Sequence, residues 1–270
     1  MNVADLMTPA PIHIEADADV DTAVGLMDQH AVRHLPVVDQ GRFVGVVSDR
    51  DLLEATGWLP RRVREARAGA SATSRRPCIR EIMHSPAMHA EPEDDILTLS
   101  IEAVVQGLGC VPVVKDGHVL GIVTERDMLK AYLEHARLAP TNSAEPLVAQ
   151  AMTQPARWIH RTATLQEARD ECQRSRVRHL PVLEDGRLVG ILSDRDLRRA
   201  VGRGCREDHA VDELMTRRPI TIAPGTLVSQ AARLFMSHHC SALPVVADGE
   251  LVGILTIEDL IDPCMKAIHV

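Results

Sequence analysis

A Ser or Thr followed three residues later by an Asp recurs in this chain, each time between a strand-like apolar run and a helical one. Such a pair can cap a helix, because the hydroxyl and the carboxylate satisfy free N–H groups at its start. Those N–H groups and the helix dipole also make a helix start a binding site for anions. The four turns, candidates for either role, are Ser48 to Asp51, Thr124 to Asp127, Ser193 to Asp196 and Thr256 to Asp259.

Two Arg-His pairs stand at the start of predicted strands. The string VRHLPV occurs twice, letter for letter, and SDRDL follows both copies at the same spacing. A core strand has no need of two polar cations where it begins, so Arg33-His34 and Arg178-His179 indicate a functional position. A recent duplication would also explain the identical strings, but the helices beside them have diverged much further. This contrast favours function.

The turns and the Arg-His pairs belong to a longer repeat with four copies. Each copy opens with a Met and a nearby Pro, continues through a helical stretch and reaches an apolar strand containing Pro-Val. A two-residue turn ending in Gly, typical of a hairpin, leads into a second strand and the Ser/Thr-x-x-Asp turn. Thr164 to Glu167 has the pattern of a capping box before one of the helices. The repeat therefore predicts strand, helix, strand, strand, helix.

The copies alternate, which indicates a duplicated module of two copies. Copies one and three share RHLP and SDRD, whereas copies two and four lack the Arg-His pair. One copy is too small to bury both faces of its sheet, so the copies should pair. We expect modules at 1–135 and 147–270. Their parts are copies at 1–56, 79–135, 147–201 and 211–270, an Arg- and Ala-rich spacer at 57–78, a linker at 136–146 and a joint at 202–210.

The composition disfavours several classes of protein. A net charge of −8 and an aromatic content of 2% argue against a nucleic-acid partner, which needs basic and stacking side chains. No apolar run is long enough to span a membrane, and the N-terminus lacks a signal-peptide pattern, so we expect a soluble, cytoplasmic protein. The six cysteines form no C-x-x-C pair and are expected to be reduced, partly buried thiols without a metal.

The repeat resembles the cystathionine β-synthase (CBS) domain family. That family's pattern is an M-T-x-x-P opening, an apolar-Pro-Val strand, a G-x-x-x-G turn and strand, and a final S/T-x-x-D. All four copies have the strand, the turn and the final motif, and each opens with a Met and a nearby Pro. The resemblance implies an α/β (α+β) fold of four tandem CBS units, paired into two Bateman modules with pseudo-twofold symmetry. Such modules commonly bind adenosine-containing ligands in clefts between the units.

The resemblance also implies roles for the residues of the turns. The family's Asp accepts hydrogen bonds from both ribose hydroxyls, which suits a carboxylate because it presents only acceptors. The expected ribose ligands are Asp51, Asp127, Asp196 and Asp259. Arg matches phosphate through its bidentate fork, and basic residues before the strand hold phosphates in the family, often those of the neighbouring unit's ligand. The expected phosphate-side residues are Ser48, Arg50, Ser193, Arg195, Thr124, Arg126, Thr256, Arg33, His34, Arg178 and His179.

Copy four departs from this pattern. It carries Glu258 where the other copies have Arg, and an acid there would repel a phosphate. We therefore expect a poorer phosphate site in copy four, and the best ribose sites in the SDRD copies. The alternative is that the charged middle residues of all the turns are exposed and merely solvate a helix start.

The expected function is regulatory. No nucleophile elbow, P-loop, HExxH or dinucleotide fingerprint is present, so we expect no enzyme. We expect a sensor of AMP, ADP or ATP that signals to an unidentified effector protein and could dimerise by stacking its modules. Two alternatives stay open: a scaffold with largely empty clefts, and a sensor of another adenosyl ligand such as NAD, S-adenosylmethionine or a cyclic dinucleotide. The Arg-His pairs favour a phosphorylated ligand.

Overall fold

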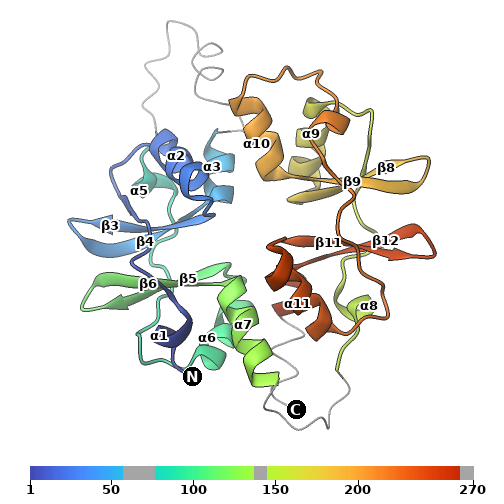
Figure 1. The fold of residues 1–270 in the computed structure, drawn as a ribbon. Coiled ribbons are helices and arrows are strands. Elements are labelled where there is room, and N and C mark those ends of the chain that lie inside the picture. Colours follow the sequence, from blue (N-terminus) through green and yellow to red (C-terminus); the bar gives the residue numbers. More distant parts are fainter. Residues whose placement is uncertain (57–76, 137–144, 262–270) are drawn as a thin grey trace, which may run out of the picture. The chain divides into compact units, whose positions relative to one another are not determined.

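A computed structural model describes residues 1–56, 77–136 and 145–261 of the chain. The chain divides into two compact units, Met1–Ala131 and Tyr132–Val270, each built from two copies of one arrangement (Figure 1). No helix in the described part of the chain is long and apolar enough to cross a membrane. Nearly all of the Arg-rich spacer and most of the linker between the modules lie outside the described residues.

The predicted order of strand, helix, strand, strand, helix is confirmed in the first unit. Copy one consists of β2 (Ile14–Glu15), α2 (Val20–His30), β3 (His34–Asp39), β4 (Arg42–Ser48) and α3 (Asp49–Thr56). Copy two has α6 (Ile96–Val105), β5 (Cys110–Lys115), β6 (His118–Thr124) and α7 (Glu125–Ala136). Its opening strand is reduced to a single parallel bridge between Ala90 and Val113. Where the first strand is complete, it also pairs in parallel, as β2 does with β3.

The second unit repeats this order. Copy three consists of β7 (Ile159–His160), α9 (Leu165–Ser175), β8 (His179–Glu184), β9 (Arg187–Ser193) and α10 (Asp194–Gly202). Copy four has α11 (Val228–His238), β11 (Ala242–Ala247) and β12 (Glu250–Thr256), with a bridge from Ile222 to Val245 in place of its first strand.

Local chemistry explains these elements. Both residues of every hairpin turn have positive φ, for example 53° at Asp116 and 82° at Gly117, as the Asp-Gly pattern predicts. The expected capping box of α9 is confirmed, since Thr164 N–H and hydroxyl donate to Glu167 Oε2 at 2.7 and 3.0 Å. These hydrogen bonds lower the pKa of Glu167 below its usual value.

The Met-Pro segment that opens each copy docks on the sheet of the other copy in its unit. We call these segments the arms; they comprise residues 2–9, 78–86, 147–155 and 211–219 and contain the short elements α1 (Val3–Leu6), β1 (Thr8–Pro9), α5 (Ile79–Ile82), α8 (Val148–Ala151), η1 (Val211–Glu213) and β10 (Thr216–Arg217). Strand β1 pairs with β6 of copy two, and β10 pairs with β9 of copy three. His84 bridges to Val46 of copy one, and Thr153 bridges to Ile254 of copy four. Paired copies therefore exchange their first residues.

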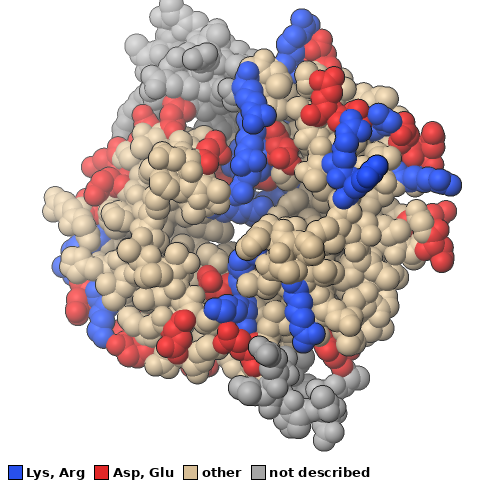
Figure 2. Space-filling view, in the orientation of Figure 1, with Lys and Arg blue, Asp and Glu red and all other residues tan. Residues whose placement is uncertain are grey.

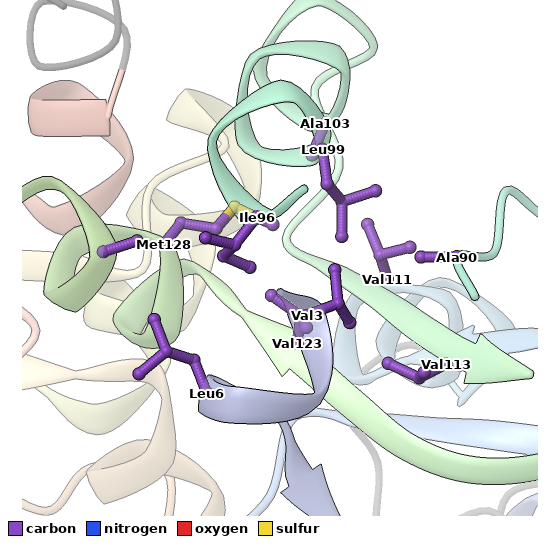
Figure 3. Close-up of a cluster of buried hydrophobic side chains, with 11 residues drawn as sticks. Val3, Leu6, Ala90, Ile96, Leu99, Ala103, Val111, Val113, Val123 and Met128 are labelled. Carbon is purple, nitrogen blue, oxygen red and sulfur yellow. The ribbon is translucent and has the colours of Figure 1, made fainter. Parts of the chain in front are cut away.

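The arms complete the hydrophobic cores. Figure 3 shows Val3 and Leu6 of the first arm against Ile96, Val123 and Met128 of copy two. Val3 is fully buried, as is Ile79 of the second arm in the core of copy one. Each such side chain stabilises the fold by about 1.5–3 kcal/mol when it leaves water. The sequence predicts that copies pair because one copy is too small to bury its sheet. In the structure the exchanged arms provide part of that pairing.

A glycine of the second hairpin strand makes room for each arm. In the Val-Gly-Val-Val run of β4, a Cβ on Gly45 would lie 2.6 Å from the carbonyl oxygen of His84 and 3.0 Å from Sδ of Met83. Gly253 in copy four meets Met152 in the same way, with Sδ 2.7 Å from the added Cβ. The Gly of the second hairpin strand and the Met of the arm, which recur in every copy, therefore pack against each other.

Candidate functional site

The Asp of every Ser/Thr-x-x-Asp turn caps its own helix start. Oδ2 of Asp51 accepts hydrogen bonds from the N–H and the hydroxyl of Ser48, both at 2.7 Å. The same two bonds occur in the other copies, with distances between 2.6 and 3.0 Å. The capping interpretation is confirmed in all four copies. It leaves one carboxylate oxygen of each Asp for another partner.

That second oxygen divides the copies into two pairs. Oδ1 of Asp51 hydrogen-bonds Nε2 of His84 at 3.1 Å, and Oδ1 of Asp259 accepts from the Thr153 hydroxyl at 3.2 Å. Both partners belong to docked arms. Within the described residues, Oδ1 of Asp127 and Oδ1 of Asp196 have no hydrogen-bond partner. The turns of copies two and three therefore present an unused acceptor oxygen.

His84 and Thr153 are not expected at the turns from the sequence. Both immediately follow the Met of an arm, and no sequence pattern shows that the arm docks on the other copy. Only knowledge that the arms are exchanged would have identified these two residues as neighbours of the turns.

The middle residues of the turns have different surroundings. Asp49 and Asp194 are only 2% and 1% exposed, so the alternative that they are exposed charges solvating a helix start is wrong for these two. Arg50 is exposed, whereas Arg126 and Arg195 are half-buried. In copy four the buried position holds Ile257, and Glu258 follows it at the surface.

Each Arg-His pair lies against the neighbouring copy. In the second unit, Arg178 forms an ion pair with Glu258 of copy four, and Nε2 of His179 lies 2.9 Å from the hydroxyl of Ser241. The pair that opens β8 therefore reaches the turn of copy four as well as the start of β11.

The first unit has the same relationship. A Cβ added to Gly109 would lie 3.0 Å from Nε2 of His34 and 3.3 Å from Oε1 of Glu125. Gly109 thus makes room for the ring of His34 beside the turn of copy two. In both units a residue of the odd-numbered copy's Arg-His pair lies at the turn of the even-numbered copy, His34 in the first and Arg178 in the second. We call each such set of residues a composite group.

Cys110 stands in copy two where copy one has His34. Burial, with the charge of Glu125 adding to it, raises the pKa of this thiol from 9.0 to about 12. Cys172 on α9 has its pKa raised to about 12 by burial and by the charge of Asp194. Both behave as neutral apolar side chains, as expected from the sequence. In the described part of the chain no three His, Cys, Asp or Glu residues gather as metal ligands do.

Copies one and three share the strings RHLP and SDRD but differ in overall charge. Residues 148–203 contain eleven Lys or Arg and seven Asp or Glu, whereas residues 3–57 contain three and ten. Figure 2 shows basic side chains spread over the part of the second unit where α9, β8 and β9 lie, with acidic ones among them. The SDRD turns of copies one and three therefore lie in different electrostatic settings.

The family model of the CBS domain matches residues 3–57, 79–134, 148–203 and 211–265. The chain is 24% identical to the uncharacterized protein MJ1225 of Methanocaldococcus jannaschii over 88% of its length and 90% of that protein. The crystal structure of MJ1225, described as a candidate archaeal homologue of g-AMPK, aligns with a TM-score of 0.77 and 22% identity over 97% of this chain and 99% of that one. The crystal structure of an uncharacterized conserved protein of Pyrococcus horikoshii aligns with a TM-score of 0.66 and 21% identity, over 98% of this chain and 100% of that one. At these identities the structures show a shared fold.

Proposed function

The chain belongs to the CBS domain family, and on that premise we propose that it senses an adenine nucleotide, AMP, ADP or ATP, and signals to a separate protein without catalysing a reaction. The observation that carries the proposal is the unused carboxylate oxygen of Asp127 and of Asp196. A ribose presents two neighbouring hydroxyl donors, and a carboxylate anchored through its other oxygen is a rigid acceptor for them.

The surroundings of these two carboxylates suit a phosphorylated ligand. Arg126 precedes Asp127 and Arg195 precedes Asp196, and a guanidinium binds phosphate oxygens in pairs. At the turn of copy two, the ring of His34 arrives from copy one. A nucleotide held there would contact both copies of the first unit.

Contact with two copies supplies a mechanism for signalling. A ligand that binds one arrangement of the paired copies better than another shifts the population towards it, by an amount set by the difference in affinity. The arms pass from one copy to the other, so they transmit any change in the pairing of the copies. The signal would then be read by an effector protein that binds one arrangement.

Asparagine variants provide the sharpest test. Asp127→Asn and Asp196→Asn keep one oxygen for the cap but replace the outer oxygen with an NH₂ group, which cannot accept from a ribose. We expect each change to weaken AMP, ADP or ATP binding at its own site by about 10- to 100-fold in calorimetry. Asp51→Asn is the matched control, because the outer oxygen of Asp51 already binds Nε2 of His84.

Thermal melting identifies the ligand first. A ligand of the native state raises the melting temperature, by the equivalent of about 2.7 kcal/mol at a concentration 100 times its Kd. The panel comprises AMP, ADP, ATP, NAD, S-adenosylmethionine and a cyclic dinucleotide, each at millimolar concentration. A shift with another adenosyl ligand alone would replace the nucleotide in the proposal. No shift with any of them would favour the scaffold.

A further inference from the structure

We propose that Glu258 is a specificity residue that excludes a 5′-phosphate from the turn of copy four, so that this turn takes an adenosine compound without that phosphate; the inference rests on the proposed function. The two units then differ in the ligands they accept. The composite group of the first unit takes the phosphorylated ligand, and that of the second takes the nucleoside.

The ion pair between Arg178 and Glu258 carries the argument. Arg178 repeats Arg33, the basic residue expected to hold a phosphate, and its side chain is 21% exposed. Glu258, 48% exposed, binds this guanidinium from the neighbouring copy. A phosphate at Arg178 would have to displace the carboxylate and would then lie beside it, which like charges oppose. The protein thus supplies its own anion where a ligand's phosphate would sit.

Copy two has the opposite charge at the same place. In the turn from Thr124 to Asp127, the residue aligned with Glu258 is Arg126. The Thr and the Asp of the turn are common to the two composite groups. The middle residues are Glu125-Arg126 in copy two and Ile257-Glu258 in copy four. The position before the Asp therefore carries an acid in copy four and a base in copy two, while the Asp expected to recognise ribose is present in both. In copy four the ribose would take the place of the Thr153 hydroxyl at Oδ1 of Asp259.

The remaining contacts of the second unit point the same way. Nε2 of His179 is engaged by the hydroxyl of Ser241, and His179 is only 9% exposed. The residue aligned with Ser241 is Gly109, which offers no hydroxyl to His34. Copy four therefore holds the basic pair of copy three with its own side chains, Glu258 and Ser241.

The inference is tested by calorimetry with AMP and adenosine on full-length chains that keep one turn intact. The background for copy four is Asp51→Asn, Asp127→Asn and Asp196→Asn. In it we expect adenosine to bind at least about 10-fold more tightly than AMP. Adding Glu258→Gln should narrow this preference, and adding Glu258→Arg should reverse it. Glu250→Gln, an exposed acid at the start of β12, is the matched control and should leave the preference unchanged.

The mirror experiment uses copy two. In a background of Asp51→Asn, Asp196→Asn and Asp259→Asn, Arg126→Glu should weaken AMP binding by at least about 10-fold and leave adenosine binding within about 2-fold. Because Glu258 is exposed, its substitution should leave the fold intact, and circular dichroism of each variant checks this.

The outcomes separate this inference from the proposed function. If wild-type chain binds AMP but Glu258→Gln and Glu258→Arg leave the ratio of AMP to adenosine affinity unchanged, Glu258 has no such role and the sensor proposal stands. The same conclusion follows if the full-length chain in which only the turn of copy four is intact binds neither AMP nor adenosine. If wild-type chain binds no adenosine compound at any turn, both proposals fall together.

Discussion

Arg80 of the second arm donates to Asp39 at the end of β3, with Nη2 2.9 Å from Oδ2, and its Nε donates to Asp17 at 3.2 Å. Its hydrogen bonds to Asp39 and Asp17 raise the pKa of Arg80 above the ordinary value. They join the first turn of α5 to the sheet of copy one, beside the buried contact of Ile79. This ion pair therefore marks where the arm of one copy is fastened to the other.

The second unit fastens its equivalent arm with reversed charges. The residue aligned with Arg80 is Asp212, whose Oδ1 lies 3.0 Å from Nη2 of Arg161. Arg161 in turn donates to both oxygens of Glu184 at the end of β8, at 2.7 Å. An arm carrying Asp212 would meet Asp17 and Asp39 in copy one, and an arm carrying Arg80 would meet Arg161 in copy three. The two carboxylates of copy one therefore disfavour the arm of the second unit, whereas copy three offers Arg80 both a cation, Arg161, and an acid, Glu184.

Reversing one of these charges should loosen the first unit. We expect Arg80→Asp to lower the melting temperature of the chain by a few degrees, because the introduced carboxylate would face Asp17 and Asp39. The double variant Arg80→Asp with Asp39→Arg should recover part of the loss. Lys130→Asp, an equally large change at an exposed site on α7, is the control for net charge. Equal effects of Arg80→Asp and Lys130→Asp in scanning calorimetry would contradict the assignment.

Filling the space above Gly45 should displace an arm. A Cβ there would meet the backbone oxygen of His84 at 2.6 Å, which no side-chain rotation relieves. We expect Gly45→Ala to lower the free energy of unfolding by about 1–3 kcal/mol in urea titrations. The control, Gly25→Ala on α2, adds a Cβ that meets nothing within 4 Å and should raise it by about 0.5–1 kcal/mol. If Gly45→Ala and Gly25→Ala both raise the free energy of unfolding, the arm accommodates the added Cβ of residue 45 at little cost.

The capping bond predicts a difference between two substitutions of one residue. Asp196→Ala removes the acceptor for the N–H and hydroxyl of Ser193 and should cost about 0.5–2 kcal/mol of stability without any ligand. Asp196→Asn retains an acceptor oxygen and should cost much less. Chemical denaturation of the unliganded chain measures both. If Asn destabilises as much as Ala, the carboxylate charge contributes more than the cap.

The buried thiols should resist alkylation. Burial raises the pKa of Cys110 from 9.0 to about 12, so the reactive thiolate at pH 8 is about 1,000-fold scarcer than in an unfolded chain. We expect iodoacetamide to label the half-exposed Cys78, Cys205 and Cys240 before Cys110, as read by mass spectrometry of peptides. Labelling of Cys110 at the rate of Cys205 in folded protein would show that β5 opens readily.

The same shift has a consequence for stability at high pH. The folded thiol of Cys110 keeps its proton, whereas that of the unfolded chain ionises near pH 9. The stabilisation is therefore fully present below about pH 9 and is lost as the pH rises towards about 12. Cys110→Ala should flatten this part of the curve of unfolding free energy against pH.

Most of the fold within a copy could be predicted from the sequence. The hairpins follow from Gly after a residue with positive φ, and the buried face of α2 follows from Val20, Ala23 and Met27 at helical spacing. Such signals are local, because each depends on residues a few positions apart. The capping role of the four Asp residues was likewise predictable, since both partners lie within one turn.

The exchange of arms could not be predicted, and with it the contacts of His84 with Asp51 and of Thr153 with Asp259. Met7 and Met83 open their copies with similar segments, and each would fit either sheet by its apolar pattern alone. Only the spatial neighbours reveal that His84 belongs with Asp51 and Glu258 with Arg178. The sequence shows that Glu258 differs from Arg126, but not which cation it meets.

Exchanged arms also set an order of events during synthesis on the ribosome. The first arm, residues 2–9, leaves the ribosome long before β5 and β6, the strands that bury it. The sheet of copy one is finished at Ser48, yet its core waits for Ile79. Neither copy can close on its own, because each lacks a piece carried by the other. The core of copy one can therefore close only after the second arm, residues 78–86, has been made, and a pause or break before that arm would leave this core open.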